Sequence, residues 1–159
     1  MTLTQAPQLQ AGESLLFVYG TLKHGFRNAA INHGRRLPGD FVTCERWPLY
    51  IIGPWRLPWL VDRVGLGERV SGQLFAVDAP TLAGMDELEL VHLPGWYRRS
   101  SLRVRGGSGG PVWSAQVYFG CAQRCQSDTV HAGPLGEYTL EHDAHCSDDG
   151  LEELAWAST

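Results

Sequence analysis

The chain has 159 residues, enough for one domain with a real core, and its 43% hydrophobic content is that of an ordinary globular protein. Its formal net charge of -4 provides no basic field to hold a phosphate backbone, which excludes a typical nucleic-acid partner. No run approaches the roughly 18 apolar residues of a membrane span, and the opening MTLTQAPQLQAGES lacks the apolar centre of a signal peptide. We therefore expect a single-domain cytoplasmic protein with no membrane partner, and the oligomeric state stays open.

Short apolar or alternating runs separated by glycine and proline dominate the sequence. After a flexible lead-in at residues 1–13, strands are predicted at 15–19, 40–44, 48–52, 69–77, 97–105 and 112–119. The segment GGSGG at 106–110 predicts a hairpin loop between the last two of these strands.

Helices are fewer than strands. The clearest follows Asp78, a good N-cap, with Pro80 in its first turn. Shorter helices are predicted at 23–32 and 148–157. Because the strands do not alternate with helices, we expect an α+β fold with a mixed, strongly curved, barrel-like sheet of about six strands and a few short helices.

Four cysteines stand in a chain without an export signal, where thiols stay reduced. Cys121 and Cys125, with His142, His145 and Cys146 downstream, are conceivable zinc ligands. Their spacing lacks the clear second cysteine pair of a structural zinc site, so free thiols are the preferred interpretation and no metal site is predicted.

One carboxylate of the predicted helix falls on its apolar face. At about 100° per residue, Glu89 lies within the stripe of Leu82 and Met85. A carboxylate on an apolar face must form an ion pair, carry a proton or serve a function such as catalysis. Either an ion pair with Arg98 or Arg99 or a catalytic role satisfies this pattern.

Several motifs in order resemble the γ-glutamylcyclotransferase superfamily, and most closely its AIG2-like, γ-glutamylamine cyclotransferase branch. They are FVYGTLKHG, PLYIIGPWRLPWLVD, VSGQLFAVD, LAGMDELE, WYRRSSLRV and AQVYF, which together cover about residues 15–120. The resemblance implies a γ-glutamylcyclotransferase-like domain at 14–120, and residues 121–159 are interpreted as a C-terminal extension of the same domain.

The resemblance also implies roles for individual residues. Its Tyr-Gly-Thr-Leu turn, which binds the γ-glutamyl group of the substrate, corresponds to Tyr19, Gly20, Thr21 and Leu22. The glutamate that closes its Leu-Asp-x-x-Glu motif corresponds to Glu89, the carboxylate that the helical pattern selects independently. A glycine in such a turn lets a ligand approach the backbone, and free N–H groups there can hold an anion.

The implied reaction is intramolecular: the α-amine of a γ-glutamyl group attacks its own γ-carbonyl and releases 5-oxoproline and an amine or amino acid. It requires no cofactor and no protein nucleophile, but it requires a base for the α-ammonium. With reference pKa values, moving that proton to a glutamate costs roughly 4.8 kcal/mol, and a glutamate pKa of about 6.5 would reduce this to roughly 1.8 kcal/mol. A binding module that holds a small ligand without turnover is the alternative.

Supporting roles are assigned more loosely. The aromatic-rich segment 47–59 either receives the apolar stem of the leaving amine or belongs to the core. Tyr97 and Arg99 match a Tyr-x-Arg motif of the family and are expected to support the pocket, and Tyr118 is a weaker candidate for its lining. The sequence departs from the family in that Leu90 stands where a glycine usually follows the glutamate, Met85 replaces a leucine, and the loop LVHLPGW before Tyr97 is longer. The longer loop reshapes the expected mouth of the substrate site and leaves the identity of the amine open.

Overall fold

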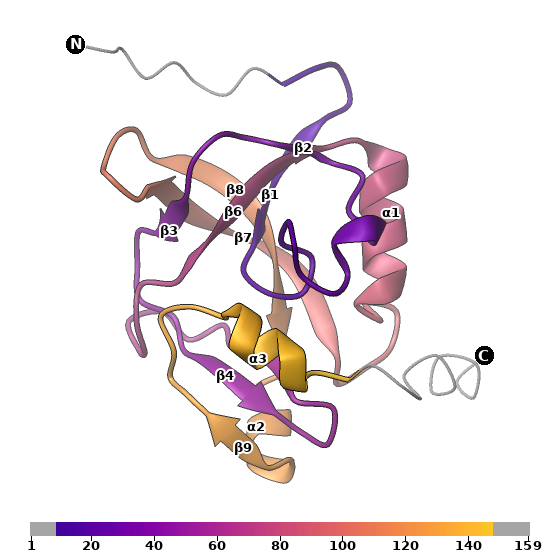
Figure 1. Cartoon of the computed structure of the whole chain (residues 1–159), viewed down its shortest axis with the longest axis vertical. Helices are drawn as coiled ribbons and strands as arrows, with labels where there is room; N and C mark the ends of the chain where they lie inside the picture. The colour runs from indigo at the N-terminus through magenta and orange to yellow at the C-terminus, as the bar shows by residue number, and fades with distance from the viewer. Residues whose placement is uncertain (1–8, 148–159) are drawn as a thin grey trace.

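The computed structural model describes residues 9–147, and strands dominate this part of the chain (Figure 1). The strands are β1 (Ser14–Val18), β2 (Arg35–Arg36), β3 (Phe41–Thr43), β4 (Leu49–Ile52), β5 (Leu57–Leu60), β6 (Ser71–Val77), β7 (Tyr97–Gly106), β8 (Trp113–Gly120) and β9 (Val130–Ala132). The helices are α1 (Ala79–Leu88), α2 (Arg124–Ser127) and α3 (Leu140–His145), with a 3₁₀ turn η1 (Ala29–Ile31). The predicted α+β class is confirmed.

The larger sheet curves until it closes. Its strand order is β1-β8-β7-β3-β6-β2, and β1 also pairs with β6, which joins the two sides into a barrel. Strand β1 is antiparallel to β6 but parallel to β8, so the sheet is mixed, as predicted. A smaller antiparallel sheet, ordered β5-β4-β9, lies at one end.

Both faces of the barrel wall are buried, which explains the continuous apolar run in β1. Leu15 and Phe17 belong to one core cluster and Leu16 and Val18 to the other. The second cluster fills the space between the barrel, β5 and α1. In Figure 1, α1 stands along one side of the barrel.

Helix α1 begins where the sequence predicts. The side chain of Asp78 accepts a hydrogen bond from the Thr81 amide at 2.9 Å, and proline occupies the first turn. The helix buries Leu82 and Met85, the two residues of the predicted apolar stripe. The hairpin loop at 106–110 is also confirmed, since β7 and β8 pair on either side of it.

Other elements differ from the prediction. The helix predicted at 23–32 is wrong: the chain forms successive turns there and only η1 is helical, because Gly25 at φ 85 interrupts the helical path. Strand β5 was missed because Pro58 argues against a strand, and the structure accommodates it at the edge of the smaller sheet. The helix predicted at 148–157 lies outside the described residues.

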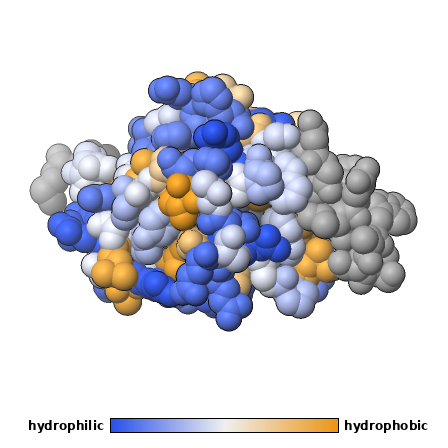
Figure 2. All heavy atoms as spheres, turned by 90° about the horizontal axis from the view of Figure 1, so that it is seen from below, coloured by the Kyte–Doolittle hydropathy of each residue, from blue (hydrophilic) through white to orange (hydrophobic). Residues whose placement is uncertain are grey.

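None of the helices described between residues 9 and 147 has the length and apolar character that a membrane crossing requires. On the face shown in Figure 2, apolar side chains form small separate groups among hydrophilic ones wherever side chains are described. The described part of that face therefore shows no broad apolar patch.

Candidate active site

A pocket opens beside the C-terminal ends of β1 and α1. The empty space within it, its open mouth included, is about 660 Å³. The five residues predicted for the site all line it: Tyr19, Gly20, Thr21, Leu22 and Glu89. The other lining residues are Phe17, Val18, Asn28, Leu57, Pro58, Leu88, Leu90, Trp96, Tyr97, Tyr118 and Cys146.

The turn after β1 forms the polar wall of the pocket. The Lys23 amide donates to the Gly20 carbonyl at 3.1 Å, and Asn28 bonds to Thr21 through both its amide and its side chain, at 2.9 and 3.0 Å. Within residues 9–147, the backbone amides of Thr21 and Leu22 meet no protein acceptor. These two donors are therefore available to a ligand.

Gly20 has a packing reason to be glycine as well. A Cβ at this position would lie 2.8 Å from Cγ of Pro58, closer than real Cβ atoms approach their neighbours. The absence of a side chain lets the turn pack against β5. A glycine at this position thus permits close packing against Pro58 in addition to the close approach of a ligand that the turn motif predicts.

Glu89 occupies the C-cap of α1. Its amide still donates to the Met85 carbonyl at 2.9 Å, so the last helical turn keeps the orientation assumed in the helical projection. The chain then leaves the helix through two more hydrogen bonds to α1, which hold Glu89 beside the pocket. The carboxylate is partly buried, and it is the one charged group that lines the pocket among the described residues.

The environment of Glu89 raises its pKa from 4.5 to about 8. The larger cause is burial, which disfavours the charged form, and the second is the negative charge of Asp86 on the same helix. At neutral pH the side chain therefore carries a proton most of the time. A group with a pKa near the working pH can both take up and release a proton.

The arginines considered as partners for Glu89 pair elsewhere. Arg98 contacts Asp62 at 2.6 Å, and Arg99 contacts both carboxylate oxygens of Asp86 at 3.0 and 3.1 Å. The ion pair proposed for Glu89 from the sequence is therefore wrong, and the pairing joins Asp86 to β7 instead. This bidentate pair fixes the end of α1 against the barrel.

Three tyrosines hold the pocket walls together. The Tyr19 hydroxyl donates to the Tyr118 carbonyl at 2.6 Å, that of Tyr97 to the Pro58 carbonyl at 2.5 Å, and that of Tyr118 to Asp86 at 2.7 Å. Burial raises the pKa of all three hydroxyls. They stay neutral and donate, so none of them competes with Glu89 as a base.

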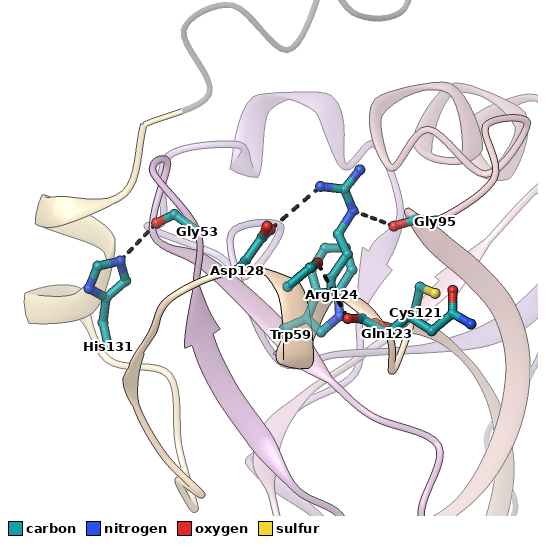
Figure 3. A network of polar contacts seen from close by, with 9 residues as sticks. Gly53, Trp59, Gly95, Cys121, Gln123, Arg124, Asp128 and His131 are labelled. Atoms are coloured by element: carbon teal, nitrogen blue, oxygen red, sulfur yellow. Dashed lines mark hydrogen bonds and ion pairs between the residues drawn. The ribbon is translucent and has the colours of Figure 1, made fainter.

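Figure 3 shows how the segment after β8 holds the loop that follows Glu89. Arg124 donates from Nε to the Gly95 carbonyl at 2.5 Å, and its guanidinium lies 3.9 Å from the centre of the Trp96 ring. Asp128 contacts the same guanidinium at 3.5 Å. Since Trp96 lines the pocket, Arg124 positions one of its walls.

The C-terminal part of the described chain supplies a further wall. Lys23 is buried and donates from Nζ to the Tyr138 carbonyl at 2.5 Å, and the Arg27 amide donates to Asp143 at 2.9 Å. Burial lowers the pKa of Lys23. These contacts dock the end of α3, which places Cys146 in the pocket lining.

Sequence reasoning missed Trp96, Arg124 and Cys146. Trp96 directly precedes the Tyr-x-Arg motif and could have been proposed from that position, whereas the other two carry no local signal. The aromatic segment 47–59 contributes only Leu57 and Pro58 to the pocket. Its tryptophans mostly serve packing, as shown by Trp59, which is fully buried and donates to the Cys121 carbonyl at 2.8 Å.

The candidate zinc ligands are dispersed. Among residues 9–147, no three cysteine, histidine or acidic side chains gather as metal ligands would. Cys146 lies in the pocket wall, and His142 is engaged in the cap of α3, where its Nδ1 accepts from the Thr139 amide at 3.0 Å. All four cysteines are free thiols.

Comparison with known proteins places the chain among relatives of one kind. Residues 16–140 match the protein family described as "Gamma-glutamyl cyclotransferase, AIG2-like". A protein from Rattus norvegicus named "Gamma-glutamylaminecyclotransferase" is 38% identical over 112 residues, which make up 65% of this chain and 74% of that protein. An Arabidopsis thaliana relative, named as a putative gamma-glutamylcyclotransferase, is 37% identical over 59% of this chain, which spans about half (52%) of its length.

The fold has a solved counterpart. The crystal structure of an AIG2-like protein from Mus musculus aligns with a TM-score of 0.66 and 28% sequence identity. The alignment covers 81% of this chain and 90% of the mouse chain. The fold of most of this chain therefore also occurs in an experimental structure.

Proposed function

Because the chain belongs to the γ-glutamyl cyclotransferase, AIG2-like family, we propose that it is a γ-glutamylamine cyclotransferase that releases 5-oxoproline from small γ-glutamyl substrates. The observation that carries the proposal is the shielded carboxylate of Glu89, whose pKa of about 8 suits proton transfer, in one pocket with the amides of the Gly20–Leu22 turn. Relatives named "Gamma-glutamylaminecyclotransferase" support the same substrate class.

In the proposed reaction, the α-nitrogen of the substrate attacks its own γ-carbonyl carbon and closes a five-membered lactam ring. The bond between that carbon and the leaving nitrogen then breaks. The α-nitrogen loses two protons as its ammonium becomes the N–H of the lactam, and the leaving nitrogen gains two protons and departs as an ammonium ion. The balance is complete without a cofactor or a covalent enzyme intermediate, and the tether within the substrate supplies the proximity.

Glu89 is the proposed carrier of these protons, beginning with the one that leaves the α-ammonium before the attack. An α-ammonium has a pKa of about 7.8, and the raised pKa of Glu89 is about 8, so the transfer is nearly level in free energy. The value of about 6.5 assumed from the sequence would have left roughly 1.8 kcal/mol uphill. A cationic substrate also favours the ionised form of Glu89 as it enters, which prepares the base for the ammonium.

The turn after β1 is the proposed site for negative charge. The amides of Thr21 and Leu22 are free of protein acceptors within the described chain and border the same pocket as Glu89. They suit the α-carboxylate of the substrate or the oxyanion that forms on the γ-carbonyl oxygen. A cytoplasmic location belongs to the same proposal, supported by the four free thiols.

The test is to incubate the purified protein with γ-glutamyl amines and γ-glutamyl dipeptides and to measure 5-oxoproline. Glu89→Gln keeps the shape of the side chain but removes the base, so we expect product from the wild type and almost none from this variant. Glu87→Gln is the matched control, because Glu87 is exposed on the same helix. Product from Glu89→Gln at the wild-type rate removes Glu89 from the mechanism, and no product from any substrate favours the non-catalytic binding module.

A further inference from the structure

The residue after Glu89 has an unusual backbone. Leu90 has φ 54, in the left-handed region, and it is one of two non-glycine residues with positive φ in the described chain. Its amide donates to the Glu87 carbonyl at 3.1 Å, and the next amide, of Val91, donates to the Asp86 carbonyl at 3.1 Å. This pair of bonds is the Schellman motif, which requires the left-handed conformation at the position that Leu90 occupies.

Leucine is a poor choice for that conformation on backbone grounds alone. The Cβ of an L-residue crowds the backbone there, and glycine is the usual occupant. The helix end therefore explains why a glycine is expected at this place but not why a leucine stands there. The side chain must contribute something that glycine cannot.

The surroundings of the Leu90 side chain indicate its contribution. It is only 6% exposed, belongs to the second core cluster and lines the pocket directly beside Glu89. Three other uncharged residues, Leu57, Trp96 and Cys146, line the same pocket and belong to the same core cluster. Strain at a residue that borders a ligand site is a recognised feature of functional positions.

The pocket lining thus combines polar and apolar groups. The free amides of the β1 turn and the carboxylate of Glu89 match the charged γ-glutamyl group, whose amine and carboxylate need such partners. The stem of the leaving amine is then left with the apolar lining. Leu90 lines the same pocket and follows Glu89, the carboxylate that must reach the leaving nitrogen, directly in the chain.

We propose that Leu90 is a specificity-determining residue whose side chain limits the bulk of the amine that the pocket accepts. The proposal rests on the cyclotransferase function proposed above. A smaller residue at this position opens the apolar lining of the pocket to branched or cyclic amines and leaves Glu89 and the amide turn in place. The strained leucine therefore selects for slender amine stems.

The test compares Leu90→Ala and Leu90→Gly with the wild type on two substrates, γ-glutamyl-methylamide and γ-glutamyl-cyclohexylamide. We expect the ratio of kcat/KM for the cyclohexylamide to that for the methylamide to rise at least about tenfold in both variants, mainly through KM for the cyclohexylamide. Leu90→Gly also relieves the backbone strain, which offsets part of the lost packing and keeps a folded variant available. Thermal unfolding of each variant verifies folding at the assay temperature.

Arg56→Gly is the matched control. Arg56 has φ 53, nearly that of Leu90, but it is exposed in the turn between β4 and β5 and does not line the pocket. The Arg56→Gly variant gains the same relief of backbone strain, and its ratio of kcat/KM for the cyclohexylamide to that for the methylamide should equal that of the wild type. A rise in the ratio in Arg56→Gly would assign the effect to general loosening and overturn the proposal.

The other outcomes are also decisive. Turnover by the wild type with the same ratio in both Leu90 variants overturns the role of Leu90 and leaves the cyclotransferase function intact. Absence of 5-oxoproline from every wild-type reaction overturns the proposed function and the specificity proposal with it. Lower kcat for both substrates without a change in ratio shows that Leu90 only positions Glu89, which also contradicts the proposal.

Discussion

Replacing Glu89 with glutamine is expected to stabilise the fold at and above neutral pH while it abolishes activity. The folded protein holds the Glu89 proton with a pKa of about 8, whereas the ordinary value is 4.5. Between these two values the unfolded chain gives up a proton that the folded chain keeps. The stability contributed by this group is therefore fully present below pH 4.5 and falls as the pH rises toward and through 8.

The size of the effect follows from the two pKa values. The ionisation of Glu89 lowers the unfolding free energy of the wild type by about 3 kcal/mol at pH 7 and about 5 kcal/mol at pH 9, relative to strongly acidic conditions. These figures are upper bounds because the side chain keeps some exposure to solvent. Glutamine has the same shape and no proton to lose, so it avoids the whole loss.

Urea denaturation of the wild type and Glu89→Gln at pH 5, 7 and 9 measures this directly. We expect the difference in unfolding free energy between the two proteins to change in favour of the variant by a few kcal/mol from pH 5 to pH 9. Glu87→Gln, on the exposed face of α1, should follow the wild type at every pH. If the difference for Glu89→Gln does not vary with pH, the shielded environment inferred for Glu89 is refuted.

Three further changes test the surroundings of the site. Asp86→Asn removes the charge that raises the Glu89 pKa and frees Arg99, so the acidic limb of the kcat/KM profile should move to lower pH; a move to higher pH contradicts this. Arg124→Met removes the hydrogen bond to the 90–96 loop and the cation–π contact, and it should lower the unfolding free energy by about 2 kcal/mol and raise KM more than it lowers kcat. An unchanged melting temperature would contradict it. Gly20→Ala places a Cβ 2.8 Å from Pro58 and should cost about 1–3 kcal/mol in chemical denaturation, whereas wild-type stability would show that the turn yields freely.

The sequence was informative about elements whose signals are local. The apolar run of β1, the N-cap at Asp78 and the glycine-rich hairpin at 106–110 each specify their structure within a few residues, and each was predicted correctly. Strand β5 was not, because Pro58 is tolerated only through its edge position, which depends on the order of strands in the sheet. Strand β9, with three residues, has too short a pattern to be seen.

The candidate site likewise combines features with local sequence signals and features that depend on how distant elements pack. The stripe of Leu82 and Met85 shows on which face Glu89 lies, because a helix relates these positions by its own period. The partner of an arginine is decided by how β7 approaches α1, so the sequence could not show that Arg99 would take Asp86 rather than Glu89. Cys146 reaches the pocket only through the docking of α3, which begins about 50 residues after α1 ends.

The pKa of Glu89 also bears on the choice between an enzyme and a binding module. A site that only holds an ammonium is served best by a carboxylate that is ionised at neutral pH, because an ion pair needs both charges. Glu89, with a pKa of about 8, is mostly protonated at that pH and begins as a weak partner for a cation. The same pKa lies within a few tenths of that of an α-ammonium, which makes the carboxylate well matched to exchange a proton with it. Burial at this position thus weakens simple binding and improves proton transfer, and that combination is what a cyclising enzyme requires.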